Sequence, residues 1–377
     1  MKRHGGVVLA TSHLWPVGTT NWPTGPDNPN PNRNPNPLPP FALLKHFCHK
    51  PTGQLLLMSA PWKVRRRRRQ QQCQQQQGDL VSSPSSSGVC VHGCLWSHAC
   101  NTSLLLDEFL ASVCSVSTGG DINTTLTFGV EADVLVHPSH SNTPVMCHPP
   151  YDASRVDITL SEFIARLDDV IRKDGIPNNV RLIVKLDFKN VEAVRPSLDI
   201  INAHSLHAQR NVEVWLNADI LLGPGHPQKS RNPTVPPHEF ISLCTSALPT
   251  CTLSLGWTHG EGTPLGYTPH MAQEIVAVTN TLKQHVTLAA SAMHLYATPT
   301  STRNELLRHF SQQDETTRGR RTLTLWGPAP FLVRRWFRRL PRDTTYVDVA
   351  AASWKAEFAA WYIALWRLLG YHDVRLL

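Results

Sequence analysis

The sequence predicts a parallel α/β fold, specifically a closed (β/α)8 TIM barrel, and three observations lead to this prediction. Strand-like apolar runs alternate with helix-like periodic segments about eight times over roughly 285 residues. Such alternation is typical of parallel sheets, whose strands are joined by crossover helices. The number of repeats favours a closed barrel over an open sheet, and polar residues recur at the carboxyl ends of the strand runs, where barrels carry their sites.

Each element is predicted from its apolar periodicity. Strands are expected at 91–97, 126–136, 144–147, 181–188, 212–220, 251–257, 286–290, 322–326 and 345–349. Helices are expected at 103–113, 160–172, 191–203, 237–247, 268–283, 303–310, 330–339 and 354–369. The first helix is expected from Leu104, Leu105, Phe109 and Leu110, which the helical pattern places on one side. A helix segment lies between almost every pair of successive strands, so the strands are expected to run in parallel.

The chain divides into two unlike parts, a predicted disordered extension at 1–88 and a predicted barrel domain at 89–377. The extension is built from simple runs: alternating Pro and Asn at 23–40, arginines at 65–69, glutamines at 70–77 and serines at 82–87. Such segments bury too little apolar surface to offset the entropy lost on ordering. A wrongly assigned gene start is the alternative explanation of this extension.

The net charge of +8 belongs to the extension. Residues 1–89 carry 11 Lys and Arg against 2 Asp and Glu, whereas the remainder carries 25 against 26. A nucleic-acid partner for the barrel therefore has no electrostatic support. The nine cysteines include no CxxC pair, and neither a signal peptide nor an apolar run long enough for a membrane span is recognised. From the sequence we expect a soluble, cytoplasmic protein with reduced cysteines.

Three predicted strands place polar side chains two residues apart, on one face of an apolar run. These residues are Glu131 and Asp133, then Lys185, Asp187 and Lys189, then Asn217 and Asp219. Burying unpaired charges costs several kcal/mol each, so a shared metal or a pocket open to water is expected. The carboxylates of Glu131, Asp133 and Asp187 would suit Mg²⁺ or Ca²⁺. Alternatively, Glu131 and Asp133 pair with the two lysines in a buried ionic cluster.

Two histidines flank these acids, His98 at the end of the first strand and His148 shortly after the first acidic pair. Two histidines, a hard cation and a lysine suit phosphodiester chemistry. One histidine would take or give a proton, the other would attack or protonate the leaving oxygen, and the metal and Lys189 would offset phosphate charge. Each histidine taken alone is more simply explained as a hydrogen-bonded structural residue.

Other polar and aromatic residues have weaker signals. Lys185, Asn217 and Asp219 are expected to support the site, and Asn217 and Asp219 suit supporting residues as well as ligands. Trp257 is a packing residue or a pocket wall. The arginines on the helix expected at 330–339 indicate a solvated face, with contact to an anionic surface as the alternative.

Six motifs, in order along residues 92–371, resemble the menorin family. They are Trp96-Ser-His98-Ala-Cys-Asn101, Glu131-Ala-Asp133, His148-Pro-Pro150, Lys185-Leu-Asp187-Phe-Lys189, Trp215-Leu-Asn-Ala-Asp-Ile220 and Leu253-Ser-Leu-Gly-Trp257. The resemblance implies a barrel similar to phospholipase-C-like phosphodiesterases, including glycerophosphodiester phosphodiesterases and sphingomyelinase-D-type toxins. The residues that match those enzymes' two histidines and three acids are His98, His148, Glu131, Asp133 and Asp187, and Lys189 resembles the toxin-type lysine.

The chain departs from those patterns in two places. Ala99 follows His98, where glycerophosphodiesterases have a His-Arg pair, and residues 288–293 lack the arginine that menorin relatives tend to carry on the sixth strand. Losing a phosphate-facing arginine weakens anion binding. Menorin relatives are associated with dendrite patterning at cell surfaces, so the resemblance also implies an extracellular location and a protein partner as alternatives.

Two functions follow as expectations. The first is a metal-dependent phosphodiesterase whose ligand is a phosphodiester or a phospholipid. The second is a non-catalytic, menorin-type interaction protein that uses the barrel mouth and its loops to bind a partner. The first requires the carboxylates to converge, whereas the second does not.

Overall fold

A computed structural model describes most of the predicted barrel domain. The described residues are 94–116, 125–136, 142–173, 175–226, 233–260, 266–311 and 319–368. The predicted disordered extension at 1–88 and the start of the strand expected from residue 91 lie outside the described residues. The domain boundary at residue 89 therefore stays a prediction.

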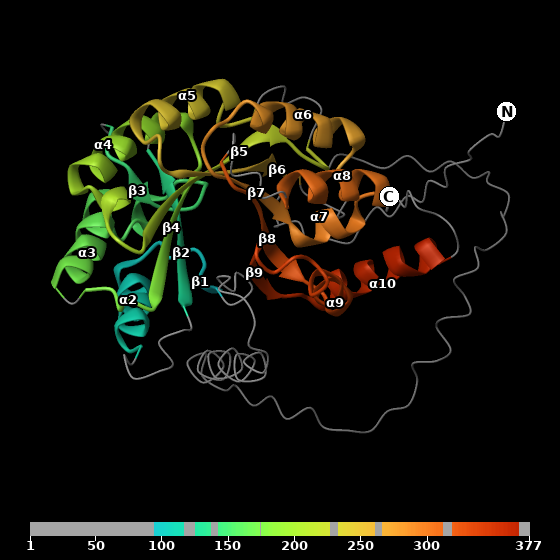
Figure 1. Cartoon of the computed structure of the whole chain (residues 1–377), viewed down its shortest axis with the longest axis horizontal. Coiled ribbons are helices and arrows are strands. Elements are labelled where there is room, and N and C mark those ends of the chain that lie inside the picture. The colour runs from blue at the N-terminus through green and yellow to red at the C-terminus, as the bar shows by residue number, and fades with distance from the viewer. Residues whose placement is uncertain are drawn as a thin grey trace, which may run out of the picture. The chain divides into compact units, whose positions relative to one another are not determined.

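The described strands form one sheet (Figure 1). Their bounds are β1 Cys94–Ser97, β2 Leu126–Leu135, β3 Val145–Met146, β4 Val180–Phe188, β5 Val212–Leu222, β6 Thr252–Thr258, β7 Val286–Ser291, β8 Arg321–Ala329 and β9 Thr345–Ala351. The sheet order is β1-β2-β4-β5-β6-β7-β8-β9 with all neighbours parallel, and the short β3 pairs antiparallel with β2. Sequential parallel neighbours of this kind are the topology of a (β/α)8 barrel.

The barrel is nearly closed. The two strands at the ends of the hydrogen-bonded order, β1 and β9, are linked by a hydrogen bond between His98 Nδ1 and the Asp348 carboxylate at 2.8 Å. Tyr346 of β9 also packs edge-on against Trp215 of β5, with ring centroids 4.7 Å apart. The predicted fold class is therefore confirmed, as a TIM-like barrel.

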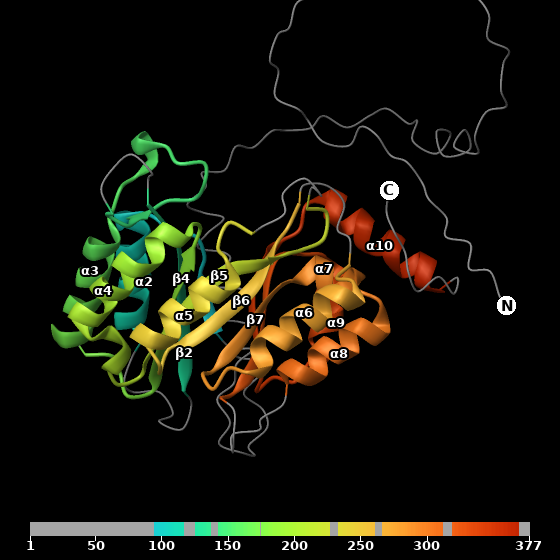
Figure 2. The same ribbon diagram turned by 90° about the horizontal axis from the view of Figure 1, so that it is seen from above.

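Helices pack around the outside of the strands (Figures 1 and 2). Their bounds are α2 Ser103–Cys114, α3 Leu160–Lys173, α4 Val194–His204, α5 Pro237–Ala247, α6 Pro269–Asn280, α7 Ala292–Ala297, α8 Thr300–Phe310, α9 Phe331–Phe337 and α10 Trp354–Leu368. Short 3-10 turns lie at Ala153–Arg155, Val191–Ala193 and Leu206–Ala208. Only α7 was not predicted, because it is too short to show a helical period. No helix in the described part of the chain is long and apolar enough to cross a membrane.

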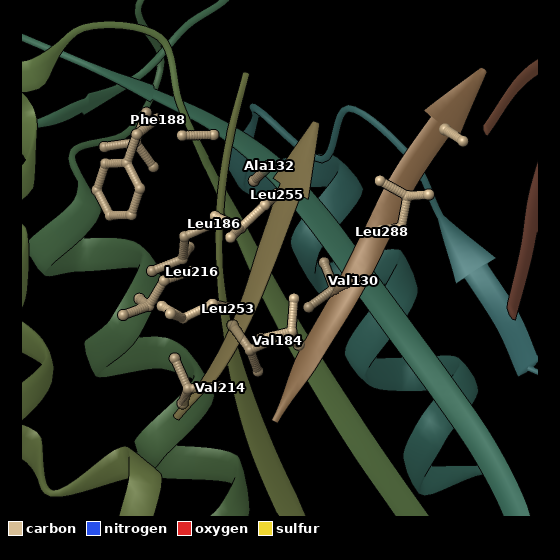
Figure 3. Packing of buried hydrophobic residues seen from close by; sticks show 14 of the residues in the cluster. Val130, Ala132, Val184, Leu186, Phe188, Val214, Leu216, Leu253, Leu255 and Leu288 are labelled. Carbon is tan, nitrogen blue, oxygen red and sulfur yellow. The ribbon is translucent and has the colours of Figure 1, made fainter. Parts of the chain in front are cut away.

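Alternating side chains divide the strands into two packing layers. Residues such as Val130, Leu186, Leu216 and Leu255 point outward into the main core beneath the helices (Figure 3). The inward residues form a separate small cluster of Cys94, Ile183, Trp215 and Tyr346, with Trp96 packed against it.

The inner cluster packs inside the barrel, on the amino-terminal side of the polar residues at the strand ends. The Trp96 indole lies over Gly129, where a Cβ atom would come within 2.4 Å of the ring. The inward residues Trp96, Gly129, Ile183, Trp215 and Tyr346 are each followed two positions later by a polar residue. In the same order, these polar residues are His98, Glu131, Lys185, Asn217 and Asp348. Because side chains i and i+2 share a face, these polar groups lie above the aromatic cluster, at the carboxyl end of the barrel.

Candidate functional site

Strand register brings the predicted acidic residues together. Asp133 of β2, Asp187 of β4 and Asn217 of β5 are partners in adjacent parallel ladders. Two residues earlier on the same face of β2 and β4, Glu131 is the register partner of Lys185. The i, i+2 pattern of each strand therefore becomes a patch that crosses three strands at the carboxyl end of the barrel.

Three carboxylates converge in this patch. One oxygen each from Glu131, Asp133 and Asp187 lies within 4.8 Å of the other two. Ligand oxygens on one Mg²⁺ or Ca²⁺ ion are about 3 to 5 Å apart, given bond lengths of ~2.0–2.6 Å. Glu131 and Asp133 are almost fully buried. The set therefore suits a hard divalent cation.

Lys189 bridges two of these carboxylates. Its Nζ lies 2.8 Å from Asp133 Oδ1 and 2.6 Å from Asp187 Oδ2. Burial by itself would lower the pKa of Lys189, but the attraction of Asp187 and Asp133 outweighs it and raises that pKa above its usual range. Burial would likewise raise the pKa of Asp187, but Lys189 and Lys185 keep it below the ordinary value. The pair is ionised in the cluster.

Glu131 faces the segment that follows β1. Its Oε2 accepts the backbone N–H of Ala99 at 2.7 Å and lies 3.3 Å from His98 Nδ1. Ala99 has φ of 51°, a left-handed conformation that is unfavourable for a residue with a Cβ atom. The turn after β1 is thus shaped around the Glu131 carboxylate. Burial raises the pKa of Glu131, against the pull of Lys185 and His98.

His98 is held by the last strand of the barrel. Its Nδ1 donates to Asp348 Oδ2 at 2.8 Å, and this bond is the main cause that raises the pKa of His98 to about 9. The nearby Glu131 carboxylate acts in the same direction, while burial opposes both. His98 is therefore protonated at neutral pH in this arrangement, with its Nε2–H left for other partners. Half of its side chain is open to solvent.

Three residues of the site were not assigned by the sequence reasoning. Asn101 exchanges two hydrogen bonds with Asp133, from Nδ2 to Oδ2 at 2.7 Å and from the Asp133 N–H to Oδ1 at 2.8 Å. Ser254 Oγ donates to Asn217 Oδ1 at 2.6 Å, and Asp348 holds His98. Asp348 could have been found from the sequence, because it is an acid at an inward position of a predicted strand, as are the acids of β2 and β4. The short side chains of Asn101 and Ser254 gave no comparable signal.

Asn217 continues the network from Asp187. Its Nδ2 donates to Asp187 Oδ1 at 2.6 Å, and Ser254 fixes its carbonyl oxygen. Asp219 lies one inward position further along β5, where burial and the charge of Asp187 raise its pKa to about 7. Lys185 is buried and interacts electrostatically with Glu131, Asp187 and Asp219, but its amine makes no ion pair with the described residues.

Two predicted residues are not joined to the acids by any described side-chain contact. His148 is exposed, and its Nδ1 bonds the carbonyl of Pro149 at 2.6 Å. Its backbone is nearby in the chain, because the N–H of Cys147 bonds the Asp133 carbonyl at 3.1 Å. Trp257 is fully buried on the outer side of β6, stacked on Tyr267 with ring centroids 4.2 Å apart.

A second group of rings lies beyond the ends of β6, β7 and β8. His259 stacks on His294 with ring centroids 4.4 Å apart, and its Nε2 bonds the Tyr267 hydroxyl at 3.0 Å. Trp326 meets His259 edge-on. Burial, followed by the proximity of His294, lowers the pKa of His259 to about 3. The described bonds of the Tyr267 hydroxyl go to His259 and to the Ser291 N–H, so these contacts do not join the rings to the acids of β2 and β4.

The charges of the site leave room for a cation. Its five carboxyl groups are those of Glu131, Asp133, Asp187, Asp219 and Asp348, and its three cationic groups are those of Lys185, Lys189 and His98. With every group ionised, the described side chains carry a formal surplus of two negative charges. One divalent ion would neutralise it, and protonation of Asp219 would reduce it.

Comparison with known proteins places the chain. The family profile described as the Menorin N-terminal domain matches residues 93–335, which leaves β9 and α10 beyond the matched range. Protein FAM151B of Homo sapiens is 34% identical over 203 residues, which cover 52% of this chain and 62% of that protein. The chain therefore matches less than two thirds of the length of this relative.

Among solved structures, the crystal structure of a Rubisco-like protein from Rhodopseudomonas palustris is similar at a TM-score of 0.39, with 9% sequence identity over 77% of this chain and 67% of that one. A likeness at this level says nothing about function. The family profile, in contrast, covers well over half of the sequence and spans the strands that carry the acids. The chain belongs to the menorin family.

Proposed function

We propose that the barrel mouth is a divalent-cation-dependent phosphodiesterase site whose ligand is a phosphodiester, phospholipids included. The observation that carries this proposal is the convergence of one oxygen each from Glu131, Asp133 and Asp187 within 4.8 Å. These three residues would hold Mg²⁺ or Ca²⁺. The cation, when bound, would offset the negative charge on the phosphate oxygens.

The surrounding residues would position those ligands. Asn101 orients Asp133, Asn217 orients Asp187, and the Ala99 N–H orients Glu131. Partners of this kind usually matter to metal affinity nearly as much as the ligands themselves. Lys189 adds a fixed positive charge beside Asp133 and Asp187. It would share the role of neutralising a bound phosphate.

The two histidines have different environments, which suits acid–base chemistry. His98 is paired with Asp348 and protonated, so its Nε2–H could be given to the leaving oxygen of the phosphodiester. The Nδ1 of His148 must carry a proton to bond the Pro149 carbonyl, which only accepts. In the neutral imidazole with that tautomer, the Nε2 of His148 has the lone pair that would attack phosphorus or take the proton of an attacking hydroxyl group.

Two observations favour the second candidate, a non-catalytic interaction protein. Lys189 already forms ion pairs with both Asp133 and Asp187, so the cluster is also reasonable as a buried ionic network without a metal. On β7, which is the sixth strand of the barrel, the inward positions are Ala289 and Ser291, which provide no cation for a phosphate. In this case the mouth and its loops would bind a partner without turnover.

Turnover of a phosphodiester panel with added Mg²⁺, Ca²⁺ or Mn²⁺ separates these candidates. The panel should include glycerophosphodiesters and lysophospholipids. His98→Ala and His148→Ala should each lower the rate at least ~10²-fold if they transfer protons or attack phosphorus. His270→Ala is the matched control, because His270 is an exposed surface histidine that pairs only with Glu274 of its own helix.

The same experiment can reject the proposal. Wild-type turnover no higher than that of the His98→Ala/His148→Ala double variant, with every substrate and metal, would favour the interaction protein. Calorimetry with the three ions tests the cation site separately from catalysis. Binding of a cation without turnover would retain the metal site and discard the phosphodiesterase.

A further inference from the structure

The helices α9 and α10 carry an exposed surface that the candidate site does not use. We call it the basic–aromatic surface, and its members are Arg334 and Arg335 of α9, Arg338 at the C-cap of α9, and Phe358, Trp361 and Leu365 of α10. The two helices lie side by side in both views (Figures 1 and 2). Arginines and large apolar side chains rarely share an uncovered surface without a partner.

The arginines surround a hollow of about 560 Å³. Phe331 and Glu357 complete its lining. The Glu357 carboxylate is engaged, because its two oxygens accept the Phe331 N–H at 3.1 and 3.0 Å. Arg334 is fixed by a bond from Nε to the Ala329 carbonyl at 2.6 Å. Arg335 and Arg338 are exposed and make no side-chain hydrogen bond or ion pair with the described residues. The hollow therefore presents a net positive charge.

The apolar residues of α10 line one uncovered face of the helix. Phe358, Trp361 and Leu365 are 68%, 57% and 54% exposed, and their spacing of three and four residues places them on one side. The opposite side is covered, since Ala360 and Ile363 are buried in the main core. A helix that is apolar on both faces is usually covered on both.

The starts of α9 and α10 lie at the same end of the barrel as the acids. α9 begins directly after β8 and α10 shortly after β9, so both helices start at the carboxyl ends of their strands. Asp348, which holds His98, is on the same β9 strand. Phe331, Arg334 and Glu357, in the first turns of these helices, therefore border the barrel mouth.

We infer that the basic–aromatic surface docks the barrel onto an anionic phospholipid bilayer. Arginine head groups at lipid phosphates, beside aromatic and aliphatic side chains that insert at the interface, are the pattern of surface-bound helices. Tryptophan is favoured at the interface because one part of its ring is apolar and the other polar.

Other occupants fit the charge or the apolar face less well. A second copy of this surface would bring like charges together. The segment 1–89 of this chain is itself strongly basic. A nucleic acid would match the arginines but would leave Phe358 and Leu365 without an apolar environment. Docking requires no turnover, so the inference goes beyond the proposed phosphodiesterase and does not depend on it.

Vesicle co-sedimentation tests this inference with the full chain. The five arginines at 65–69 should be replaced by serine in every protein compared, because that run would add its own attraction to anionic lipid. Vesicles of phosphatidylcholine alone and with about 30% phosphatidylserine are the two probes. Stronger binding to the anionic vesicles is expected, and added salt should weaken it.

Two variants with matched controls locate the contact. Arg335→Glu/Arg338→Glu should lower partitioning onto anionic vesicles at least about 10-fold, whereas Arg195→Glu/Arg308→Glu, an equal charge change on exposed residues of α4 and α8, should lower it far less. Phe358→Ser/Trp361→Ser should weaken the binding that remains at high salt. Leu104→Ser, at an exposed leucine of α2, is its control.

Equal losses in the surface variants and their controls would overturn the inference. So would binding to single-stranded RNA that depends on Arg335 and Arg338 when vesicle binding does not. Turnover of a water-soluble glycerophosphodiester, if the site is active, should be unchanged in Arg335→Glu/Arg338→Glu, since neither arginine contacts the acids. A failure of docking is therefore distinguishable from a failure of the proposed activity.

Discussion

The mouth of the barrel has two unlike halves. The charged half is formed by β9, β1, β2, β4 and β5, whose inward side chains near the strand ends are acids, lysines and a histidine. The neutral half is formed by β6, β7 and β8, whose inward residues carry no charge and are small except for Trp326: Ser254, Gly256, Thr287, Ala289, Ser291, Thr324 and Trp326. Both halves belong to one sheet of parallel strands, and the register shifts between Asp219 and Leu221 where β5 meets β6. The main difference between the halves is therefore in the side chains.

The difference lies in the chemistry that each half presents at the mouth. The charged half has carboxylate oxygens that suit a cation, with His98 beside them, whereas the neutral half provides mostly small side chains and hydroxyl groups. The halves meet at Gly256, where a Cβ atom would come within 2.9 Å of Asp219 Oδ1 and 2.8 Å of the Ala289 carbonyl. A small residue at that point allows Asp219 to lean toward the neutral half.

The largest effect is expected from a ligand of the charged half. Asp187→Asn removes a carboxylate from the triad and one partner of Lys189, so divalent-cation affinity should fall at least ~100-fold, more than supporting residues usually cost. Calorimetry with Mg²⁺, Ca²⁺ and Mn²⁺ measures this. Asp169→Asn is the control, because that exposed acid pairs only with Lys173 on α3. Equal affinity in wild type and Asp187→Asn would remove the distinction between the halves.

A large shift is also expected where the charged half closes the barrel. In the metal-free protein, Asp348→Asn should lower the pKa of His98 from about 9 toward the ordinary 6.5, because the bond to Asp348 is the main cause of its rise. The asparagine oxygen can still accept from Nδ1, so the geometry is kept while the charge is lost. Titration of the His98 ring by NMR, assigned with a His98→Asn variant, checks it. An unchanged titration would show that Asp348 does not set the charge of His98.

The same pair predicts a pH window for stability. The folded-state pKa of His98 lies above its unfolded value, so the pair stabilises the fold fully below about pH 6.5 and loses this contribution as the pH rises through about 9. The difference in unfolding free energy between wild type and Asp348→Asn should therefore be larger at pH 6 than at pH 10. A difference independent of pH in urea unfolding would contradict this.

A smaller effect is expected at the contact between the halves. Ser254 of the neutral half bonds Asn217, which in turn bonds Asp187. Ser254→Ala should lower cation affinity about 10-fold by loosening Asn217, as is usual for a residue that supports a ligand. Calorimetry measures the change, and Ser254→Thr, which keeps the hydroxyl group, should recover part of the affinity. Identical losses in both variants would indicate a packing effect instead.

The smallest effect is expected inside the neutral half. Thr287 and Thr324 share a buried hydrogen bond of 2.7 Å between their hydroxyl groups, and neither hydroxyl group bonds a carboxylate among the described residues. Thr287→Val should cost about 1 kcal/mol of stability, because it leaves the Thr324 hydroxyl unpaired, and should change cation affinity less than about twofold. A large loss of cation affinity in Thr287→Val would mean that the two halves act as one site.

The resemblance to known phosphodiesterases was informative where the sequence keeps their motifs. The ordered motifs identified the family before any geometry, and the acids of β2 and β4 converge as the resemblance implied. The sixth strand, β7, lacks the expected arginine, and in the structure its inward positions near the mouth carry the small residues Ala289 and Ser291. The charged half supports a phosphodiesterase, and the neutral half is the reason to test turnover directly.

The sequence by itself determined the elements and which residues share a face. Alternation of apolar and polar positions identifies each strand, and a spacing of two puts Glu131 beside Asp133 and Asp187 beside Lys189. These are local consequences of backbone geometry, so they can be read from neighbouring residues. The eightfold repeat of strand and helix then indicated a barrel, because parallel strands need outer crossovers.

Only the tertiary structure decided which of these faces meet. The bond between His98 and Asp348 joins residues 250 positions apart, and it depends on the first and last strands approaching each other. The sharing of Lys189 between Asp133 and Asp187, and the outward direction of Trp257 into the core, depend on register and packing between strands. A local pattern carries no information about these contacts, because they are set by how the whole sheet curves and closes.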